Sequence, residues 1–203
     1  MVVNKILYYV GNFASKGRFD MKVCAFLAEG YEEVEALAVV DVLRRAKADV
    51  KIVSVTEEYL VESSRGVTIK ADALFNDIDY DEVDLLFLPG GLPGTNNLYD
   101  FEPLRKLIYK FNDEGKRLAA VCAAPSVFGR MGILNGKKAT CYPGFEDMLE
   151  GAVCVPDRVV TDGNITTSRG MGTSVELGLE IVRLFAGEGE CHDLAVKIQH
   201  ITA

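Results

Sequence analysis

A cysteine stands at the end of an apolar run, where the chain breaks into small residues and a proline. The run covers residues 118–121, Cys122 follows it, and Ala123, Ala124 and Pro125 come next. A side chain at such a strand-to-helix turn is lifted above the edge of a sheet, where the first amides of the helix favour a thiolate. The pattern is therefore consistent with a nucleophile elbow at Cys122. A plain buried cysteine is the alternative, and this segment alone leaves both open.

A glutamate falls in the apolar stripe of the helix that we predict over residues 32–46. On a helical wheel with about 100° per residue, Glu35 lies between Val42 and Ala46. Burial disfavours a charged carboxylate and raises its pKa, so a carboxyl here can keep its proton and serve as acid and base in turn. Alternatively, the aliphatic stem packs and the carboxylate reaches solvent, and the helix alone does not decide between the two.

Two glycines follow another apolar run. The segment LPGGLPGTNN covers residues 88–97, and Gly90 and Gly91 let backbone amides approach a ligand closely. Such amides can donate to an oxyanion, although a plain turn would have the same sequence. A second glycine-rich segment, SRGMGTS at residues 168–174, is not a complete dinucleotide motif, and we predict a turn and a helix cap there.

Strand and helix patterns alternate after the first 20 residues. Solidly apolar strands between helices predict an α/β fold with a mostly parallel sheet covered on both faces. Sites in such folds form at the carboxyl ends of strands, so the loops after Leu27, Leu88 and Val121 are the candidates. Thr173 and Glu176 are expected to form a capping box at the last long helix. The predicted strands are 22–27, 49–55, 83–91, 117–122 and 137–143, with hairpins at 60–73 and 159–170, and the predicted helices are 32–46, 96–115, a short one after Cys122, 173–187 and 189–198.

Composition and charge restrict the class of protein. The 203 residues carry a formal net charge of −8, which argues against nucleic acid or an anionic membrane as a partner. No apolar run reaches the roughly 18 residues that span a bilayer. Five cysteines without a Cys-x-x-Cys pair fit neither a disulfide framework nor a zinc ribbon, so we expect no metal and a reducing, cytoplasmic setting. Because His192 and His200 follow the last predicted strand, we expect no Cys-His dyad.

The first 20 residues differ from the rest, with one short apolar run and then a loose segment of glycine, serine and lysine. They lack the features of a convincing signal peptide. We expect residues 21–203 to form a single domain. Residues 1–20 are interpreted as an extension, either an artefact of start-site choice or cloning, or an added edge strand.

Four segments, in this order, resemble the DJ-one/ThiJ/PfpI superfamily. AEGYEEVEALAVVDVLRRA is similar to its glutamate-bearing first helix, VDLLFLPGGLPGTNNL to its glycine loop, AAVCAAPSVFG to its cysteine elbow, and TTSRGMGTSVELGLEIV to its C-terminal strand, loop and helix. The resemblance implies a flavodoxin-like three-layer sandwich with a cysteine nucleophile elbow, and a homodimer. It also implies that Arg65 of the partner subunit approaches the cysteine pocket.

Two positions depart from the pattern of superfamily members, and the first of them separates the branches. Ala123 stands where protease-like and heat-shock glyoxalase members have a histidine, so the chain looks closer to the DJ-one and bacterial YajL (ThiJ) branch. Tyr142, expected in the pocket, takes the place of a histidine found in the human member, so the resemblance implies no proton-transferring histidine at that position.

The resemblance implies a glutathione-independent glyoxalase. Cys122 would add to the aldehyde of methylglyoxal, Glu35 would move a proton between carbons, and the amides of Gly91 and Ala123, beside Gly90, would hold the oxyanion. Removal of early glycation adducts from proteins is a related implied activity. The alternative class is an oxidative-stress sensor or redox-linked chaperone, with Cys122 oxidised to a sulfinate. Thiazole monophosphate biosynthesis is a third and remote alternative, because no phosphate-binding loop is evident in the sequence. No cofactor is implied.

Overall fold

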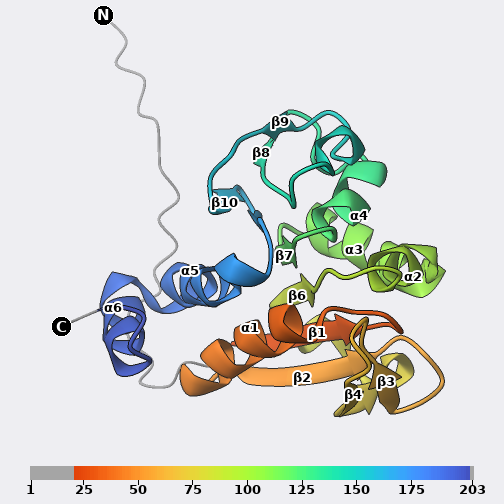
Figure 1. Ribbon diagram of the computed structural model, residues 1–203, viewed down its shortest axis with the longest axis horizontal. Helices are drawn as coiled ribbons and strands as arrows, with labels where there is room; N and C mark the ends of the chain where they lie inside the picture. The colour runs from red at the N-terminus through yellow and green to blue at the C-terminus, as the bar shows by residue number, and fades with distance from the viewer. Residues whose placement is uncertain (1–20, 202–203) are drawn as a thin grey trace, which may run out of the picture.

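A seven-stranded sheet runs through the centre of the molecule in the computed structural model, which describes residues 21–201 (Figure 1). The interpretation of residues 1–20 as an extension lies outside the described residues. Neighbouring strands are parallel except for one antiparallel pair at the edge, β10 and β11. The strands, in their order across the sheet, are β10 (Val159–Asp162), β11 (Ile165–Ser168), β7 (Arg117–Val121), β6 (Leu85–Leu88), β1 (Lys22–Leu27), β2 (Asp49–Ser54) and β5 (Ala73–Leu74).

Helices cover both faces of this sheet, which confirms the predicted α/β class. Two apolar clusters fill the space between sheet and helices, one under α1, α5 and α6 and the other under α2, α3 and α4. None of the helices within residues 21–201 is long and apolar enough to cross a membrane. The helices are α1 (Glu33–Arg45), α2 (Gly94–Asp100), α3 (Glu102–Asp113), α4 (Pro125–Arg130), α5 (Ser174–Ala186) and α6 (Glu188–Lys197).

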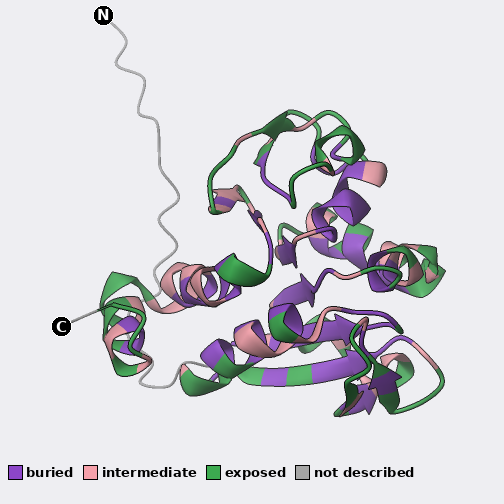
Figure 2. Ribbon diagram, viewed as in Figure 1, coloured by how far each residue is buried: buried purple, intermediate pink, exposed green. Residues whose placement is uncertain are grey.

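The central strands are buried along their length, as Figure 2 shows in purple. Every residue of β6 is buried, and so is all of β7 except its first residue, Arg117. A parallel strand with helices on both sides has no solvent face, so each of its side chains must be apolar or small. This requirement explains why unbroken apolar runs, rather than alternating patterns, predicted these strands correctly.

The strand order reverses direction between β1 and β6. From β1 the chain continues outward to β2 and β5, whereas β6, β7 and β11 extend the sheet on the other side. Ligands bind at such a switch point because the loops leave in opposite directions and open a crevice. The loops after Leu27, Leu88 and Val121 all start at this edge, as the sequence predicted.

Two small strand pairs lie outside the main sheet. The predicted hairpin near residues 60–73 forms as the antiparallel pair β3 (Leu60–Glu62) and β4 (Thr68–Lys70). The strand predicted over 137–143 is mostly wrong, because only β8 (Lys138–Ala139) forms there and pairs with β9 (Val153–Cys154). The backbone amides that follow β8 do not continue this strand pair. The Thr140 amide donates to the Thr167 side chain, and the Tyr142 amide donates to the Cys122 carbonyl.

Two local predictions on helices are also wrong. The single helix over 96–115 is two helices, since Phe101 is extended and the ring of Pro103 would collide with the carbonyl of Tyr99 in a continuous helix. The capping box at α5 does not form. Thr173 donates instead to the carbonyl of Gly170, and Glu176 forms an ion pair with Arg158.

Candidate active site

Cys122 lies at a sharp turn between β7 and α4. Its φ of 62° is in the left-handed region, which non-glycine residues rarely adopt. The turn is held on both sides of the residue, since the Cys122 amide donates to the carbonyl of Ser168 at 2.9 Å and its carbonyl accepts from the amide of Tyr142 at 2.8 Å. Backbone strain of this kind persists only where surrounding contacts fix it. The half-buried thiol is thereby held over the carboxyl edge of the sheet.

Glu35 reaches the same place from the first turn of α1. Its side chain is 1 % exposed, so the carboxyl points into the protein, as the helical wheel indicated. The amide of Gly90 donates to its Oε2 at 3.0 Å. The Cys122 thiol and the amide of Met171 also hydrogen-bond to this carboxyl. The structure therefore brings the predicted acid and the predicted nucleophile together.

A glycine is required where the acid and the thiol meet. A Cβ at Gly90 would lie 2.5 Å from Oε2 of Glu35 and 2.7 Å from Cβ of Cys122. The amide of Gly90 is engaged by Glu35, so it positions the acid. The two amides that hydrogen-bond to the sulfur are those of Gly91 and Ala123.

The loop after β6 is joined to the loop before α1 by backbone hydrogen bonds. Glu32 donates to the carbonyl of Gly90 at 2.9 Å, and Gly94 donates to the carbonyl of Gly30 at 3.1 Å. The loops approach so closely that a Cβ at Gly91, whose φ is 91°, would lie 2.5 Å from the nitrogen of Glu32. The carboxylate of Glu32 then caps α1 by accepting from the amide of Glu35 at 2.6 Å.

The environment of the pair shifts the pKa of both groups. Burial raises the pKa of Glu35 from 4.5 to about 7, against the opposing effect of its hydrogen bonds from Cys122 and Gly90. Burial and then the charge of ionised Glu35 raise the pKa of the Cys122 thiol to about 12, and the Ala123 and Gly91 amides only partly offset this. The expected helix effect on the thiol is thus outweighed. Near neutral pH the pair therefore carries no more than one negative charge.

The model of the DJ-1/PfpI family matches residues 21–184 of the chain. The chain belongs to this family. It is 44% identical to Protein DJ-1 homolog B of Arabidopsis thaliana over 82% of the chain and 39% of that protein. It is 32% identical to Deglycase PfpI of Pyrococcus furiosus over 81% of the chain and 99% of that protein. The structure of oxidized Toxoplasma gondii DJ-1 superposes with a TM-score of 0.85 at 33% identity, covering 88% of this chain and 98% of that one.

The chain spans less than half the length of the plant DJ-1 homologs that it matches. The family match itself covers β1 through most of α5, including the switch point and all four segments that carried the resemblance. Membership in the family therefore rests on the part of the chain that builds the Cys122 and Glu35 pair.

The remaining predicted site residues lie around this pair. Tyr142 is half-exposed at 51%, and its ring lies 3.3 Å from where a Cβ of Gly170 would be. Arg65 is exposed on the turn between β3 and β4, and that turn meets the loop before α1 because the Ser64 amide donates to the Tyr31 carbonyl at 2.7 Å. No described contact joins Arg65 to Cys122 or Glu35 within one chain.

Sequence reasoning missed two backbone groups of the site. The carbonyl of Ser168 holds the elbow, and the amide of Met171 hydrogen-bonds to Glu35. Both belong to the glycine-rich segment that was interpreted as a turn and a cap. Glycines near a third strand end were the available signal, since this segment follows β11, which is next to β7.

The two histidines lie away from the pair. His192 is on α6 and His200 follows that helix, and both are exposed. Within residues 21–201 no group of three or more histidine, cysteine, aspartate or glutamate side chains is arranged to hold a metal ion.

Proposed function

We propose that the chain is a cysteine-dependent, glutathione-independent glyoxalase with deglycase-like activity on 2-oxoaldehydes such as methylglyoxal. The observation that carries this proposal is the buried carboxyl of Glu35 in hydrogen-bond contact with the thiol of Cys122, whose sulfur also faces two backbone amides. An acid with a pKa near 7 is suited to both accept and return a proton at physiological pH.

The reaction begins with addition of the Cys122 sulfur to the aldehyde carbon. The new C–S bond converts the carbonyl into an oxyanion, which the amides of Gly91 and Ala123 stabilise. After this oxygen is protonated, Glu35 takes the proton from the former aldehyde carbon while the neighbouring ketone oxygen gains a proton, which gives an enediol. Glu35 then returns its proton to the neighbouring carbon as the first hydroxyl loses its own, so the hemithioacetal becomes a thioester of lactate. Water then cleaves the thioester, which releases lactate and restores the thiol.

Two observations support this proposal. Ala123 follows the nucleophile, so the residue next to the cysteine supplies an amide but no base. Deglycase PfpI is named for its activity on glycation adducts, and it matches this chain over nearly its whole length. The half-exposed ring of Tyr142 lies beside Gly170, in the segment whose Met171 amide hydrogen-bonds to Glu35.

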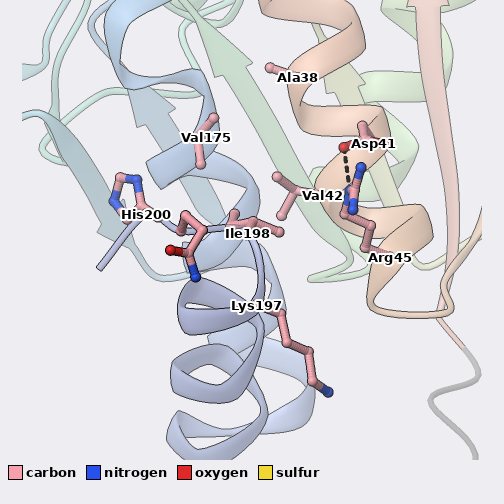
Figure 3. A pocket seen from close by; sticks show the side chains of 9 residues that line it. Ala38, Asp41, Val42, Arg45, Val175, Lys197, Ile198 and His200 are labelled. Atoms are coloured by element: carbon pink, nitrogen blue, oxygen red, sulfur yellow. Dashed lines mark hydrogen bonds and ion pairs between the residues drawn. The ribbon is translucent and has the colours of Figure 1, made fainter. Parts of the chain in front are cut away.

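We propose that the functional unit is a homodimer formed through the α1 face. Val34 and Met171 are apolar side chains beside the site that are 46% and 57% exposed. Further along α1 lies a groove of about 590 Å³ between α1, the start of α5 and the end of α6 (Figure 3), lined in part by Val42, Val175 and Ile198. A second copy covering this face would shield the rim and bring Arg65 of the partner subunit toward the pocket.

The glyoxalase proposal is tested by methylglyoxal turnover without glutathione. Purified wild type should produce lactate, and Cys122→Ala should produce none above the uncatalysed background. The matched control is Cys191→Ala, on α6 and away from the switch point, which should keep the wild-type rate. Absence of lactate formation in clean wild-type protein would overturn the proposal.

The dimer proposal is tested by light scattering. The measured mass should be twice that of one chain, and Val34→Asp should shift the mass toward that of a single chain.

A redox sensor is the second candidate, because a protonated carboxyl beside Cys122 could donate a hydrogen bond to a sulfinate oxygen. The similar Toxoplasma gondii structure is of an oxidized protein. Mild peroxide should then give one sulfinate, at Cys122, by mass spectrometry. Glu35→Asp should reduce its yield, and oxidation spread evenly over the five cysteines would contradict a sensor role.

A further inference from the structure

Two cysteines outside the proposed active site lie at one turn of the chain. Cys154 ends β9 and is in register with Ala139 of β8, and this pairing continues through the Val155 amide, which donates to the Ala139 carbonyl at 3.0 Å. Cys141 lies two residues after Ala139 in the sequence. In this parallel register Cys141 is diagonal to Cys154, and diagonal neighbours in a sheet lie about 7–8 Å apart, so a disulfide between the two cysteines requires a shift of the chain that follows Ala139.

The sulfurs of both cysteines contact consecutive residues of one turn within the segment that connects the parallel strands β8 and β9. The thiol of Cys154 lies 3.8 Å from the carbonyl oxygen of Glu146, and the amide of Phe145 hydrogen-bonds to the sulfur of Cys141. The two thiols are close enough that charge on Cys154 raises the pKa of Cys141. The fold thus holds two thiols against the same turn, although they are 13 residues apart in sequence.

The pair combines an accessible thiol with a protected one. Cys154 is exposed to solvent, whereas Cys141 is 2% exposed. Burial raises the pKa of Cys141 to about 12 and also raises the pKa of Cys154, and Glu146 acts in the same direction on both. An oxidant would therefore reach Cys154 first, because its thiol is the accessible one.

We propose that Cys141 and Cys154 are a redox-active pair that forms a reversible intramolecular disulfide when the protein meets a peroxide. The Cys154 thiolate attacks a peroxide oxygen and becomes a sulfenic acid as hydroxide leaves. The thiolate of Cys141 then attacks that sulfur, the S–S bond forms and a second hydroxide leaves. Two thiols lose two protons and two electrons, and hydrogen peroxide is reduced to two waters.

The other cysteines have no such arrangement. Cys24 is buried within β1, and the thiol of Cys191 donates to the carbonyl of Leu179 at 3.3 Å on the opposite face of the sheet. Cys122 contacts Glu35, and its carbonyl accepts from the amide of Tyr142, the residue that follows Cys141. Closure of the disulfide would consequently pull on the residue next to Cys141 that holds the elbow.

Peptide mapping tests the pair directly, because trypsin releases residues 139–158 as one peptide that contains both cysteines and no other. Wild-type protein is treated with hydrogen peroxide, the remaining thiols are alkylated, and the mass of the peptide is measured by mass spectrometry. We expect it to be lighter than the reduced peptide by two hydrogen atoms and to carry no alkyl group. A protease that cuts after Glu146 or Glu150 should leave its two halves linked until a thiol reductant separates them.

Three variants separate this pair from the proposed active site. Cys154→Ser should restore alkylation of Cys141, while Cys191→Ser and Cys122→Ala should keep the linkage. Retention in Cys122→Ala makes the result independent of any glyoxalase activity. Double alkylation of peptide 139–158 after peroxide treatment, or linkage of either cysteine to Cys122 or to a second chain, would overturn the proposal.

Discussion

Cys24 and Cys122 both belong to the core of the same sheet, yet their surroundings give them different chemistry. Burial raises the pKa of each thiol to about 12. Cys24 lies in the middle of β1, paired on one side with Lys51 and on the other with Leu86, and none of its described contacts is a hydrogen-bond donor to sulfur. Cys122 lies one residue beyond its strand, where two amides and a carboxyl reach the sulfur. Burial alone makes a cysteine inert, and the strand end supplies the groups that make it usable.

Removing the acid should make Cys122 resemble Cys24. Glu35→Gln keeps the shape of the side chain but cannot exchange a proton, so we expect methylglyoxal turnover to fall by about 10²–10⁴-fold. Lactate formation at saturating substrate measures the effect. Glu33→Gln, on the same turn of α1, is the matched control and should retain the wild-type rate. Equal losses in both variants would mean that the helix, not the acid, was disturbed.

The pH dependence of stability should distinguish the surroundings of Cys122, which include Glu35, from those of Cys24. Since the pKa of Glu35 is raised to about 7, the folded protein keeps a proton between pH 4.5 and 7 that the unfolded chain has released. The free energy of unfolding therefore decreases as pH rises through this window, by up to about 3 kcal/mol from this group. Urea unfolding of wild type and Glu35→Gln at pH 5 and pH 7.5 isolates the contribution. A constant difference between the two proteins would show that Glu35 titrates normally.

A methyl group placed between acid and thiol should have an intermediate effect. Gly90→Ala forces Cβ into Glu35 and Cys122, so we expect a loss of about 1–3 kcal/mol in unfolding free energy together with reduced turnover. Gly172→Ala, near the site but with open space around its Cβ, should change neither. Thermal unfolding and lactate formation on the same samples provide the measurement, and wild-type turnover in Gly90→Ala would show that the acid need not touch the thiol.

The smallest effect is expected at Cys24 itself. Cys24→Ala leaves a small cavity in the core and should cost about 1 kcal/mol of stability, while turnover stays within error of wild type. Chemical denaturation and the methylglyoxal assay decide the outcome. A strong loss of activity at unchanged stability would mean that the strand interior takes part in the chemistry, and the contrast between the two cysteines would fail.

Side-chain patterns predicted the parts of the site that side chains build. The apolar runs of β1, β6 and β7 located the switch point, and the wheel placed Glu35 in the buried stripe of α1. The amide of Met171 and the carbonyl of Ser168 belong to the backbone, which is the same at every residue, so only the glycines of their segment marked the place. The break at Phe101 and the short β8 followed from tertiary contacts that a local pattern does not contain.

The hydrogen bonds from Glu32 to Gly90 and from Gly94 to Gly30 join two loops that are about 60 residues apart along the chain. Neither loop can move without breaking a bond to the other, so the first turn of α1 and the glycine loop behave as one rigid body. The carboxyl of Glu35 is set at its working distance when the chain folds. Binding of an aldehyde therefore does not have to order the carboxyl of Glu35, and the binding free energy can be used to orient the aldehyde itself.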